Sequence, residues 1–495
     1  MFEPADITRD VLSLLSGILF PLALAPFDFW PLALLVPGVL LACTRTGSVR
    51  RTVGRFYLFN LGLYGAGASW IYVSVHEYGG APALLAGSLV ALLVLAFSLT
   101  SLPQALLFAR YCRTSAITLV AGFSGLWVLG ECFKAWIFTG FPWLFLGYGL
   151  TETGFANLAP VTGIYGLSLV AVLMSCALVT GVLDRAPAWW LLPVALLPLL
   201  LLEPDRWTRE RDSITVSLVQ GNVDQHVKWH KSSRQPIVDL YVSESSTEWG
   251  RDLVVWPEAA ITYFREQAPL LLEQLGQRAR SAGSTLVLGI PDRDAAGGFQ
   301  NTVLAIGTGQ GQYIKRRLVP FGEYVPLEDY LRGIVQVLDL PMSRNRPGPP
   351  VQAPLMAGDL VVSTSICYEV IYPELVRSAA ADPDLLLTVS NDTWFGASIG
   401  PWQHLQMARM RALENGRSMV RATSNGITAL IDHRGQITAV LPQFERGVLR
   451  GELSVRTGQT PFHRLGSLPV LLMALLLVLL PIAAPALWRY FRPMR

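Results

Sequence analysis

Charged residues are distributed very unevenly along this 495-residue chain, and this distribution limits its possible architectures more than any other feature. Of the 75 Lys, Arg, Asp and Glu residues, 18 lie in the first 203 positions, 54 lie in residues 204–466, and three follow. The middle segment has a charge density close to that of globular proteins. We therefore predict a membrane domain at 1–203, a soluble domain at 204–466, and a C-terminal membrane helix with a short tail at 467–495.

The apolar parts of the chain contain stretches long enough to cross a bilayer, which takes about 20 residues. Seven such stretches precede the soluble segment and one follows it, which predicts a multi-span α-helical domain with eight transmembrane helices. The first two are short and rich in Pro, so they could instead form a re-entrant pair. The expected bounds are 9–25, 28–44, 56–75, 83–109, 115–133, 158–183, 187–203 and 467–488.

The arginines between the spans predict how the chain is oriented. They follow the second, fourth and sixth spans, whereas the alternate connections contain almost no Lys or Arg, and positive loops stay in the cytoplasm. We therefore expect both termini in the cytoplasm and residues 204–466 outside the cytoplasmic face. The arginines in question are Arg45, Arg50, Arg51, Arg55, Arg110, Arg113 and Arg185. A net charge of +3 gives no case for a nucleic-acid partner.

Only one of the five cysteines, Cys367, lies in the soluble segment. A structural cysteine in an oxidising compartment is normally paired in a disulfide. The single thiol is therefore either buried and inert or used in chemistry.

The soluble segment alternates between short apolar runs and amphipathic stretches, a pattern typical of an α/β domain with helices covering its sheets. The expected strands are 213–219, 252–256, 284–290, 302–307, 360–366, 385–390, 419–424 and 427–432. The expected helices are 232–247, 266–281, 373–381 and 402–416.

Reactive side chains follow three of these strands. Glu258 lies in VVWPEAA, Lys315 ends a short strand in YIKRRLVPFGEYVP, and Cys367 lies at a strand-to-helix elbow in SICYEVIYPE. Each residue also has a simpler interpretation: a solvated loop Glu, a solvated basic run that includes Arg316 and Arg317, and a packed apolar cysteine.

Together the three residues favour acyl transfer. Glu258 would accept the thiol proton, and Lys315 would favour the thiolate and then stabilise the tetrahedral oxyanion, as would the backbone N–H that follows Cys367. No histidine stands out as the partner of a Cys–His pair, and His404 and His433 lack ligands for a metal site. We expect neither a metal nor a cofactor.

The motifs KRRLVPFGEYVP, ICYE and SNDTWFG resemble those of the nitrilase, or carbon–nitrogen hydrolase, superfamily. Insertion of such a domain between seven spans and one more resembles a single branch, the apolipoprotein N-acyltransferases of the Gram-negative inner membrane. The resemblance implies an αββα sandwich in which Glu258 is the base, Lys315 stabilises the oxyanion and Cys367 is the nucleophile. It assigns supporting roles to Glu323, Tyr368, Glu369 and Trp229. For Trp229, Asn391 and Trp394, substrate contact and a purely structural role both stay open.

The resemblance also implies a ping-pong reaction, and we expect the protein to be a monomer. Cys367 would take an acyl chain from the sn-1 position of a phospholipid such as phosphatidylethanolamine. The thioester would then pass the chain to the α-amino group of the diacylglyceryl-cysteine of an apolipoprotein. As a hypothesis, the apolar stretch 327–342, with Leu331, Ile334, Val335 and Leu338, forms a lid or a membrane-dipping arm.

Two other functions compete with this interpretation. A membrane-anchored amidase or nitrilase-type hydrolase would use the same residues, but seven spans exceed what anchorage needs. A transporter or receptor would need polar groups that face one another inside the spans. Glu77, Glu131 and Lys134 are expected near span ends, which gives that function little support.

Overall fold

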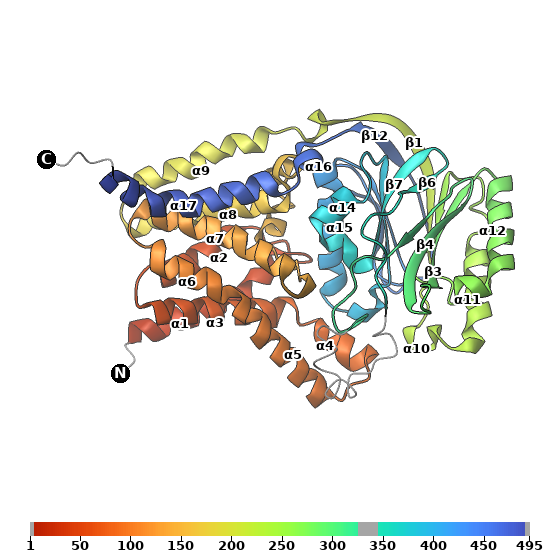
Figure 1. Ribbon diagram of the computed structural model, residues 1–495, viewed down its shortest axis with the longest axis horizontal. Helices are drawn as coiled ribbons and strands as arrows, with labels where there is room; N and C mark the ends of the chain where they lie inside the picture. The colour runs from red at the N-terminus through yellow and green to blue at the C-terminus, as the bar shows by residue number, and fades with distance from the viewer. Residues whose placement is uncertain (1–3, 325–344, 491–495) are drawn as a thin grey trace. The chain divides into compact units, whose positions relative to one another are not determined.

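A computed structural model describes residues 4–324 and 345–490 of the chain (Figure 1). The chain divides into two compact units, one formed by residues 1–203 with 464–495 and the other by residues 204–463. The first unit is helical and the second is built on two sheets. The stretch 327–342, for which an arm was predicted, lies outside the described residues.

Helices occupy all eight stretches for which spans were predicted. Three helical segments are long and apolar enough to cross a membrane, namely Ala83–Tyr111, Ala116–Thr139 and Gly154–Leu183. Three shorter apolar helices, Pro31–Thr44, Pro187–Leu201 and Leu468–Leu479, fall below that length within the described residues. The helices of this unit are α1 (Pro4–Leu19), α2 (Pro31–Thr44), α3 (Val49–Gly67), α4 (Ile71–Val73), α5 (Ala83–Ser98), α6 (Leu102–Tyr111), α7 (Ala116–Trp136), α8 (Ala159–Leu183), α9 (Leu191–Leu196) and α17 (Leu468–Tyr490).

The third helix begins earlier than the sequence predicted, and this changes the environment of one arginine. Ser48 caps α3 by accepting a hydrogen bond from the backbone N–H of Arg51, so the basic run lies in the first turns of the helix. Arg55, which was expected in a loop, is fully buried and binds Asp6 at 2.7 Å and Asp10 at 2.8 Å. This arginine therefore joins α3 to α1.

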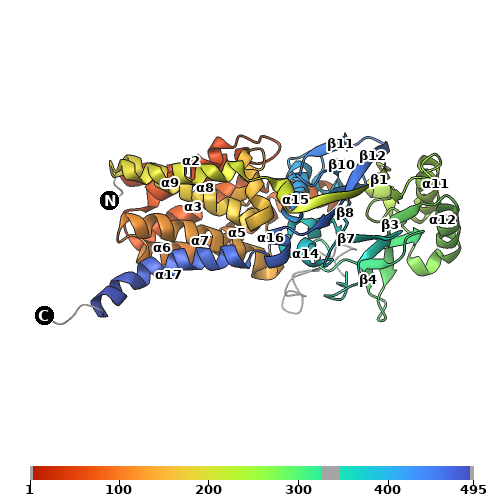
Figure 2. The same ribbon diagram turned by 90° about the horizontal axis from the view of Figure 1, so that it is seen from above.

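The C-terminal helix α17 packs closely on α7 of the same unit (Figure 2). A Cβ atom at Gly125 of α7 would lie 2.4 Å from the carbonyl oxygen of Ala474 in α17. Only glycine permits such a close approach of two helix backbones, as is common in membrane helix pairs. The last helix is thus fixed against the bundle formed by the first part of the chain.

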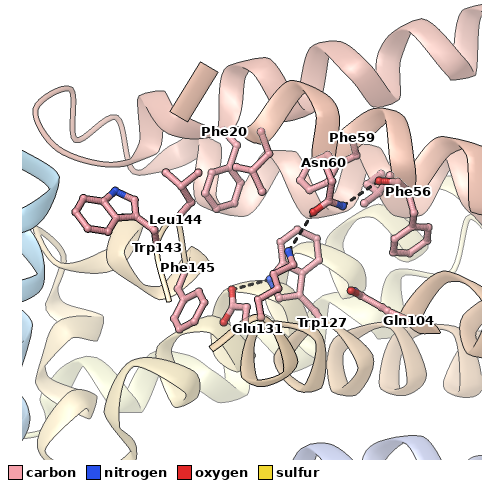
Figure 3. Close-up of a pocket in the computed structure, with 13 residues that line it drawn as sticks. Phe20, Phe56, Phe59, Asn60, Gln104, Trp127, Glu131, Trp143, Leu144 and Phe145 are labelled. Atoms are coloured by element: carbon pink, nitrogen blue, oxygen red, sulfur yellow. Dashed lines mark hydrogen bonds between the residues drawn. The ribbon is translucent and has the colours of Figure 1, made fainter. Parts of the chain in front are cut away.

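A polar cluster lies inside the helical unit, contrary to the expectation that Glu131 and Lys134 offer little polar character to its interior. Glu131 is 4% exposed, and its Oε1 accepts a hydrogen bond from Trp127 Nε1 at 3.0 Å (Figure 3). The same oxygen accepts one from the backbone N–H of Leu146 at 2.9 Å. Lys134 donates to Asn60 Oδ1 at 3.1 Å. Glu131 is buried and Lys134 is half-buried, rather than at the end of a span, because α7 continues beyond them to Trp136.

Glu131 anchors a buried segment that is not α-helical. Residues 141–150, between α7 and α8, are all buried, and their backbone groups need partners within an apolar unit. The carboxylate supplies one acceptor to Leu146, and the Ser168 hydroxyl supplies another to the N–H of Gly147 at 2.9 Å. The cluster therefore has a structural role, which is to supply acceptors to the buried backbone of residues 141–150.

The second unit contains two six-stranded mixed sheets, with strand orders β12-β1-β2-β3-β4-β5 and β11-β10-β9-β8-β7-β6. In each sheet three central strands are parallel, β1-β2-β3 and β7-β8-β9. The strands are β1 (Thr208–Gln220), β2 (Leu253–Val255), β3 (Thr285–Arg293), β4 (Phe299–Gly307), β5 (Gln312–Ile314), β6 (Leu355–Ala357), β7 (Leu360–Ile366), β8 (Leu385–Ser390), β9 (Met419–Thr423), β10 (Thr428–Ile431), β11 (Ile437–Leu441) and β12 (Gly447–Gly458).

Alternation along the strands creates the layers of this unit. In β2, Leu253 and Val255 enter a core shared by both sheets, whereas Val254 faces a second core that includes side chains of α11 and α12. Figure 1 shows α11 and α12 over one sheet and α14 and α15 over the other. The result is the predicted four-layer αββα sandwich. Its helices are α10 (Gln225–Lys228), α11 (Arg234–Glu244), α12 (Pro269–Ser281), α14 (Pro373–Ser378) and α15 (Gly400–Asn415), and α16 (Pro461–Leu465) follows at its end.

The structure contains every predicted strand and helix of the soluble segment, and 360–366 and 385–390 agree to the residue. The sequence analysis missed β6, β11 and β12. The long strand β12 has exposed polar residues along much of its length and is held by antiparallel pairing with β1. Its apolar pattern is therefore too weak to identify a strand without its partner.

We expect Glu131→Leu to destabilise the helical unit, because it leaves the Trp127 and Leu146 donors buried without an acceptor. Each such donor costs about 1–3 kcal/mol. Thermal unfolding of the full chain in detergent should show a midpoint several degrees below that of the parent. Glu131→Gln, which keeps a carbonyl oxygen, serves as the control and should lose less. An unchanged midpoint for Glu131→Leu would contradict the anchoring role.

Candidate active site

Glu258 lies in a tight loop that follows β2. The backbone N–H of Asn391 donates to its Oε2 at 2.7 Å, and Asn301 Nδ2 donates to its Oε1 at 2.5 Å. The carboxylate is almost fully buried. Gly289 of β3 permits this loop, because a Cβ there would lie 2.5 Å from the backbone nitrogen of Ala259. The loop fixes both oxygens of Glu258 in a dry environment.

Lys315 follows β5 and is 1% exposed. Its Nζ lies 2.8 Å from Glu323 Oε1 and 3.5 Å from Glu258 Oε1, so one ammonium group joins two carboxylates. Burial alone would lower the pKa of Lys315, but the charges of Glu323 and Glu258 outweigh it and hold that pKa above its ordinary value. The lysine is therefore a permanent cation.

Cys367 is the first residue after β7 and has a φ of 51°, in the left-handed region that few residues other than glycine adopt. The residue is only half-buried, and the elbow turns it out of the strand direction before α14 begins at Pro373. Burial and the charge of Glu258 raise the pKa of the thiol, and Lys315 acts in the opposite direction. A thiol whose pKa is raised needs a base to remove its proton during attack, which is the role expected of Glu258.

Glu369 joins the segment that carries Lys315 to the elbow that carries Cys367. Its Oε1 accepts hydrogen bonds from the backbone N–H groups of Arg316 at 2.6 Å and Arg317 at 3.0 Å, and its Oε2 accepts one from Ile366 at 2.8 Å. Burial raises the pKa of this carboxyl, and these N–H groups oppose the shift. Glu369 is therefore a buried residue that holds the backbone next to Lys315 and next to Cys367 in place.

The remaining residues singled out from the sequence occupy different positions. The Asn391 side chain is held by Gln225 Oε1 at 2.9 Å and Thr393 Oγ1 at 2.7 Å, which favours a structural role. Trp229 packs edge to face with Phe299, and its buried Nε1 has no hydrogen-bond partner among the described residues. Tyr368 is buried against the ring of Tyr372, and Trp394 is half-buried in the turn Asp392–Phe395.

The structure shows one charged residue in a different environment from the one predicted, and another that the sequence analysis missed. Arg316, predicted to be solvated, is half-buried and donates to Tyr313 Oη at 3.1 Å and to the carbonyl oxygen of Pro350 at 2.8 Å. Lys228, which the sequence analysis missed, is 1% exposed and donates to the carbonyl oxygen of Glu258 at 3.3 Å. Burial lowers the pKa of Lys228 to about 8, and the charge of Glu258 opposes this.

Sequence reasoning also missed Asn301 and His404. Asn301 binds Glu258, and His404 Nε2 lies 3.2 Å from the carbonyl oxygen of Cys367. Neither residue has a local sequence signal, because each reaches the site only through the pairing of strands or the packing of a helix. Within residues 4–324 and 345–490, no group of three or more His, Cys, Asp or Glu side chains is placed to hold a metal ion.

Comparison with known proteins assigns both units to described families. Residues 215–462 match the carbon-nitrogen hydrolase family, and residues 16–177 match the apolipoprotein N-acyltransferase N-terminal domain. The two matches together extend over most of the helical unit and nearly all of the sheet-based unit.

Several relatives are similar to this chain over nearly the whole of both sequences. Apolipoprotein N-acyltransferase of Pseudomonas syringae pv. tomato is 44% identical over 94% of this chain and 95% of its own length. The enzyme of Azotobacter vinelandii is 44% identical over 95% and 94%, and that of Vibrio vulnificus is 38% identical over 93% and 94%. The chain therefore belongs to the apolipoprotein N-acyltransferase family.

Proposed function

We propose that this membrane protein transfers an acyl chain from a phospholipid to the N-terminus of an apolipoprotein, as the names of its relatives indicate. The observation that carries the proposed mechanism is the ion pairing of the Lys315 ammonium with the carboxylates of Glu258 and Glu323. Glu369 holds the segment after Lys315 and the residue before Cys367 together, through the backbone N–H groups of Arg316 and Ile366. This set of a base, a fixed cation and a nucleophile is what acyl transfer through a thioester requires.

In the first half-reaction, Glu258 accepts the proton of Cys367 as the sulfur attacks the sn-1 ester carbonyl of the phospholipid. The Lys315 ammonium and the backbone N–H of Tyr368 stabilise the tetrahedral oxyanion. Collapse of the intermediate breaks the ester bond, and the leaving glycerol oxygen takes the proton from Glu258. The products are a thioester on Cys367 and a lysophospholipid.

In the second half-reaction, the α-amino group of the diacylglyceryl-cysteine attacks the thioester carbonyl. Glu258 accepts a proton from the attacking amine, the C–S bond breaks, and the proton returns to the Cys367 sulfur. The product is an amide on a triacylated lipoprotein. Water must be kept from the thioester during this exchange, because its attack would make the enzyme a lipase.

We place this chemistry on the periplasmic side of the inner membrane, in a monomer with eight spans and both termini in the cytoplasm. Both substrates carry acyl chains, and each buried CH₂ group contributes about 0.8 kcal/mol, which confines them to the bilayer. The three long apolar helices and the positions of the arginines support the membrane topology. We propose phosphatidylethanolamine as the donor. An amidase would not need acyl-bearing substrates and is not favoured by the relatives.

We expect a covalent acyl group on Cys367 after the purified protein meets phosphatidylethanolamine in detergent. The intact mass of the parent should rise by one acyl group, and an equal amount of lysophospholipid should form. Cys367→Ala should show no gain in mass. The control is Cys132→Ser, which removes another half-buried cysteine and should still be acylated. A gain in mass by Cys367→Ala would contradict the proposal.

We expect Glu258→Gln to shift the titration of Cys367 to lower pH, because the Glu258 charge is one cause of the raised thiol pKa. The rate of Cys367 alkylation, followed by peptide mass, rises as pH passes through the thiol pKa. Its midpoint should lie below that of the parent. Acyl-enzyme formation should nevertheless fall about 100-fold or more, because the base is lost.

The control for the change in charge is Glu374→Gln, which neutralises a half-exposed carboxylate paired with Arg377. Its alkylation midpoint and acylation rate should match those of the parent. A midpoint for Glu258→Gln at or above the parent value would show that Glu258 does not act on the thiol.

A further inference from the structure

His404 of α15 lies behind the nucleophile and is fully buried. Its Nε2 is 3.2 Å from the carbonyl oxygen of Cys367, which is hydrogen-bond distance. A carbonyl oxygen can only accept, so Nε2 must carry a proton for this contact to be favourable. The sequence analysis gave His404 no role, and the proposed mechanism does not use it.

The other ring nitrogen fixes this protonation state. His404 Nδ1 lies 3.0 Å from Asp392 Oδ1 and 3.1 Å from Arg421 Nη2, and Arg421 Nη2 also binds Asp392 Oδ2 at 2.5 Å. In the neutral ring Nδ1 accepts from the guanidinium, and in the charged ring it donates to the carboxylate. Both states leave Nε2–H directed at Cys367. All three side chains are fully buried, so water does not compete for these bonds.

Asp392 is itself held firmly. Burial alone would raise the pKa of its carboxyl, but Arg421 and His404 hold that pKa well below its usual range. The Ser390 hydroxyl donates to Asp392 Oδ1 at 2.5 Å. A Cβ atom added at Gly426 would lie 2.6 Å from the Cβ of Asp392, so the backbone of Gly426 packs directly against this side chain. The carboxylate therefore has little freedom to move, and neither has the imidazole that it orients.

The hydrogen bond to Cys367 also acts on the next residue. The carbonyl of Cys367 and the N–H of Tyr368 are the two ends of one peptide group. A donor on the carbonyl oxygen polarises that group and strengthens its N–H as a donor, by an amount estimated at about 10–30% per bond in a chain. It also fixes the plane of the peptide, which follows a residue with a φ of 51°.

We infer that His404 is a positioning residue, which orients and polarises the Cys367–Tyr368 peptide so that its N–H receives the oxyanion of the tetrahedral intermediate. The inference rests on the proposed thioester chemistry. The segment that carries Asp392 also supplies the Asn391 N–H that binds Glu258 Oε2 at 2.7 Å. One strand end, that of β8, thus supports both the base and the oxyanion donor.

The test compares two reactions of the same sulfur. Acylation of Cys367 by phosphatidylethanolamine passes through an oxyanion, whereas alkylation by iodoacetamide is a displacement at a saturated carbon and forms none. Loss of a direct oxyanion donor costs about 10²–10³-fold in rate, so weakening one should cost less. In His404→Leu we expect acylation to fall about tenfold or more and alkylation to change less than about twofold, in the full chain in detergent.

A second variant and a matched control complete the experiment. His404→Gln keeps an amide N–H that can reach the carbonyl, and it should recover part of the acylation rate. His463→Leu removes another buried histidine, whose Nε2 lies 2.9 Å from the carbonyl oxygen of Ala381. Both of its rates should equal those of the parent. Where His404→Leu does not fold, His404→Asn replaces it, because the shorter amide cannot reach the carbonyl.

Equal losses of acylation and alkylation in the His404 variants would overturn the inference, because they would indicate general damage to the site. Two unchanged rates would also overturn it. A parent protein that is alkylated at Cys367 but never acylated by phospholipid would instead contradict the proposed function. The two failures are therefore distinguishable.

Discussion

The site depends on one buried cation, the Lys315 ammonium, which lies between Glu323 and Glu258. Removing an ammonium from water costs several kcal/mol, and only well-placed opposite charges offset that cost. Two carboxylates from different segments surround it, so each segment is held in place by the same charge. The position of Glu258, the shape of the loop 318–324 and the electrostatic environment of Cys367 all follow from this arrangement.

The second constraint is the way in which buried carboxylates bind backbone N–H groups. Glu369 accepts from three of them and so links the Lys315 segment to the Cys367 elbow, while Asp392 orients His404 behind that elbow. Glu369 and Asp392 are both buried, and they affect the site by positioning its backbone and side chains rather than by touching the substrate. They allow a left-handed residue to sit at the nucleophile position, where its strain is balanced by fixed hydrogen bonds.

Much of this organisation could be predicted from the chain itself. The strands 360–366 and 385–390 were identified because they are short runs rich in aliphatic and β-branched residues, which are typical of strands. The reactive residues were found because they follow such strands. His404 and Lys228 were not, since their roles come from packing between segments distant in sequence. The start of α3 was missed because its first turns contain arginines, of which Arg55 is buried by ion pairs that no local pattern indicates.

A double-mutant cycle between Lys315 and Glu323 tests the central claim most directly. The measured quantity is the rate at which phosphatidylethanolamine acylates Cys367 in the parent, Lys315→Met, Glu323→Gln and the double variant. If Glu323 acts by holding the ammonium, the double variant should be hardly slower than Lys315→Met alone. If the double variant instead loses rate by the product of the two single-variant losses, the two residues act independently. The account of a site organised by one shared cation would then be wrong.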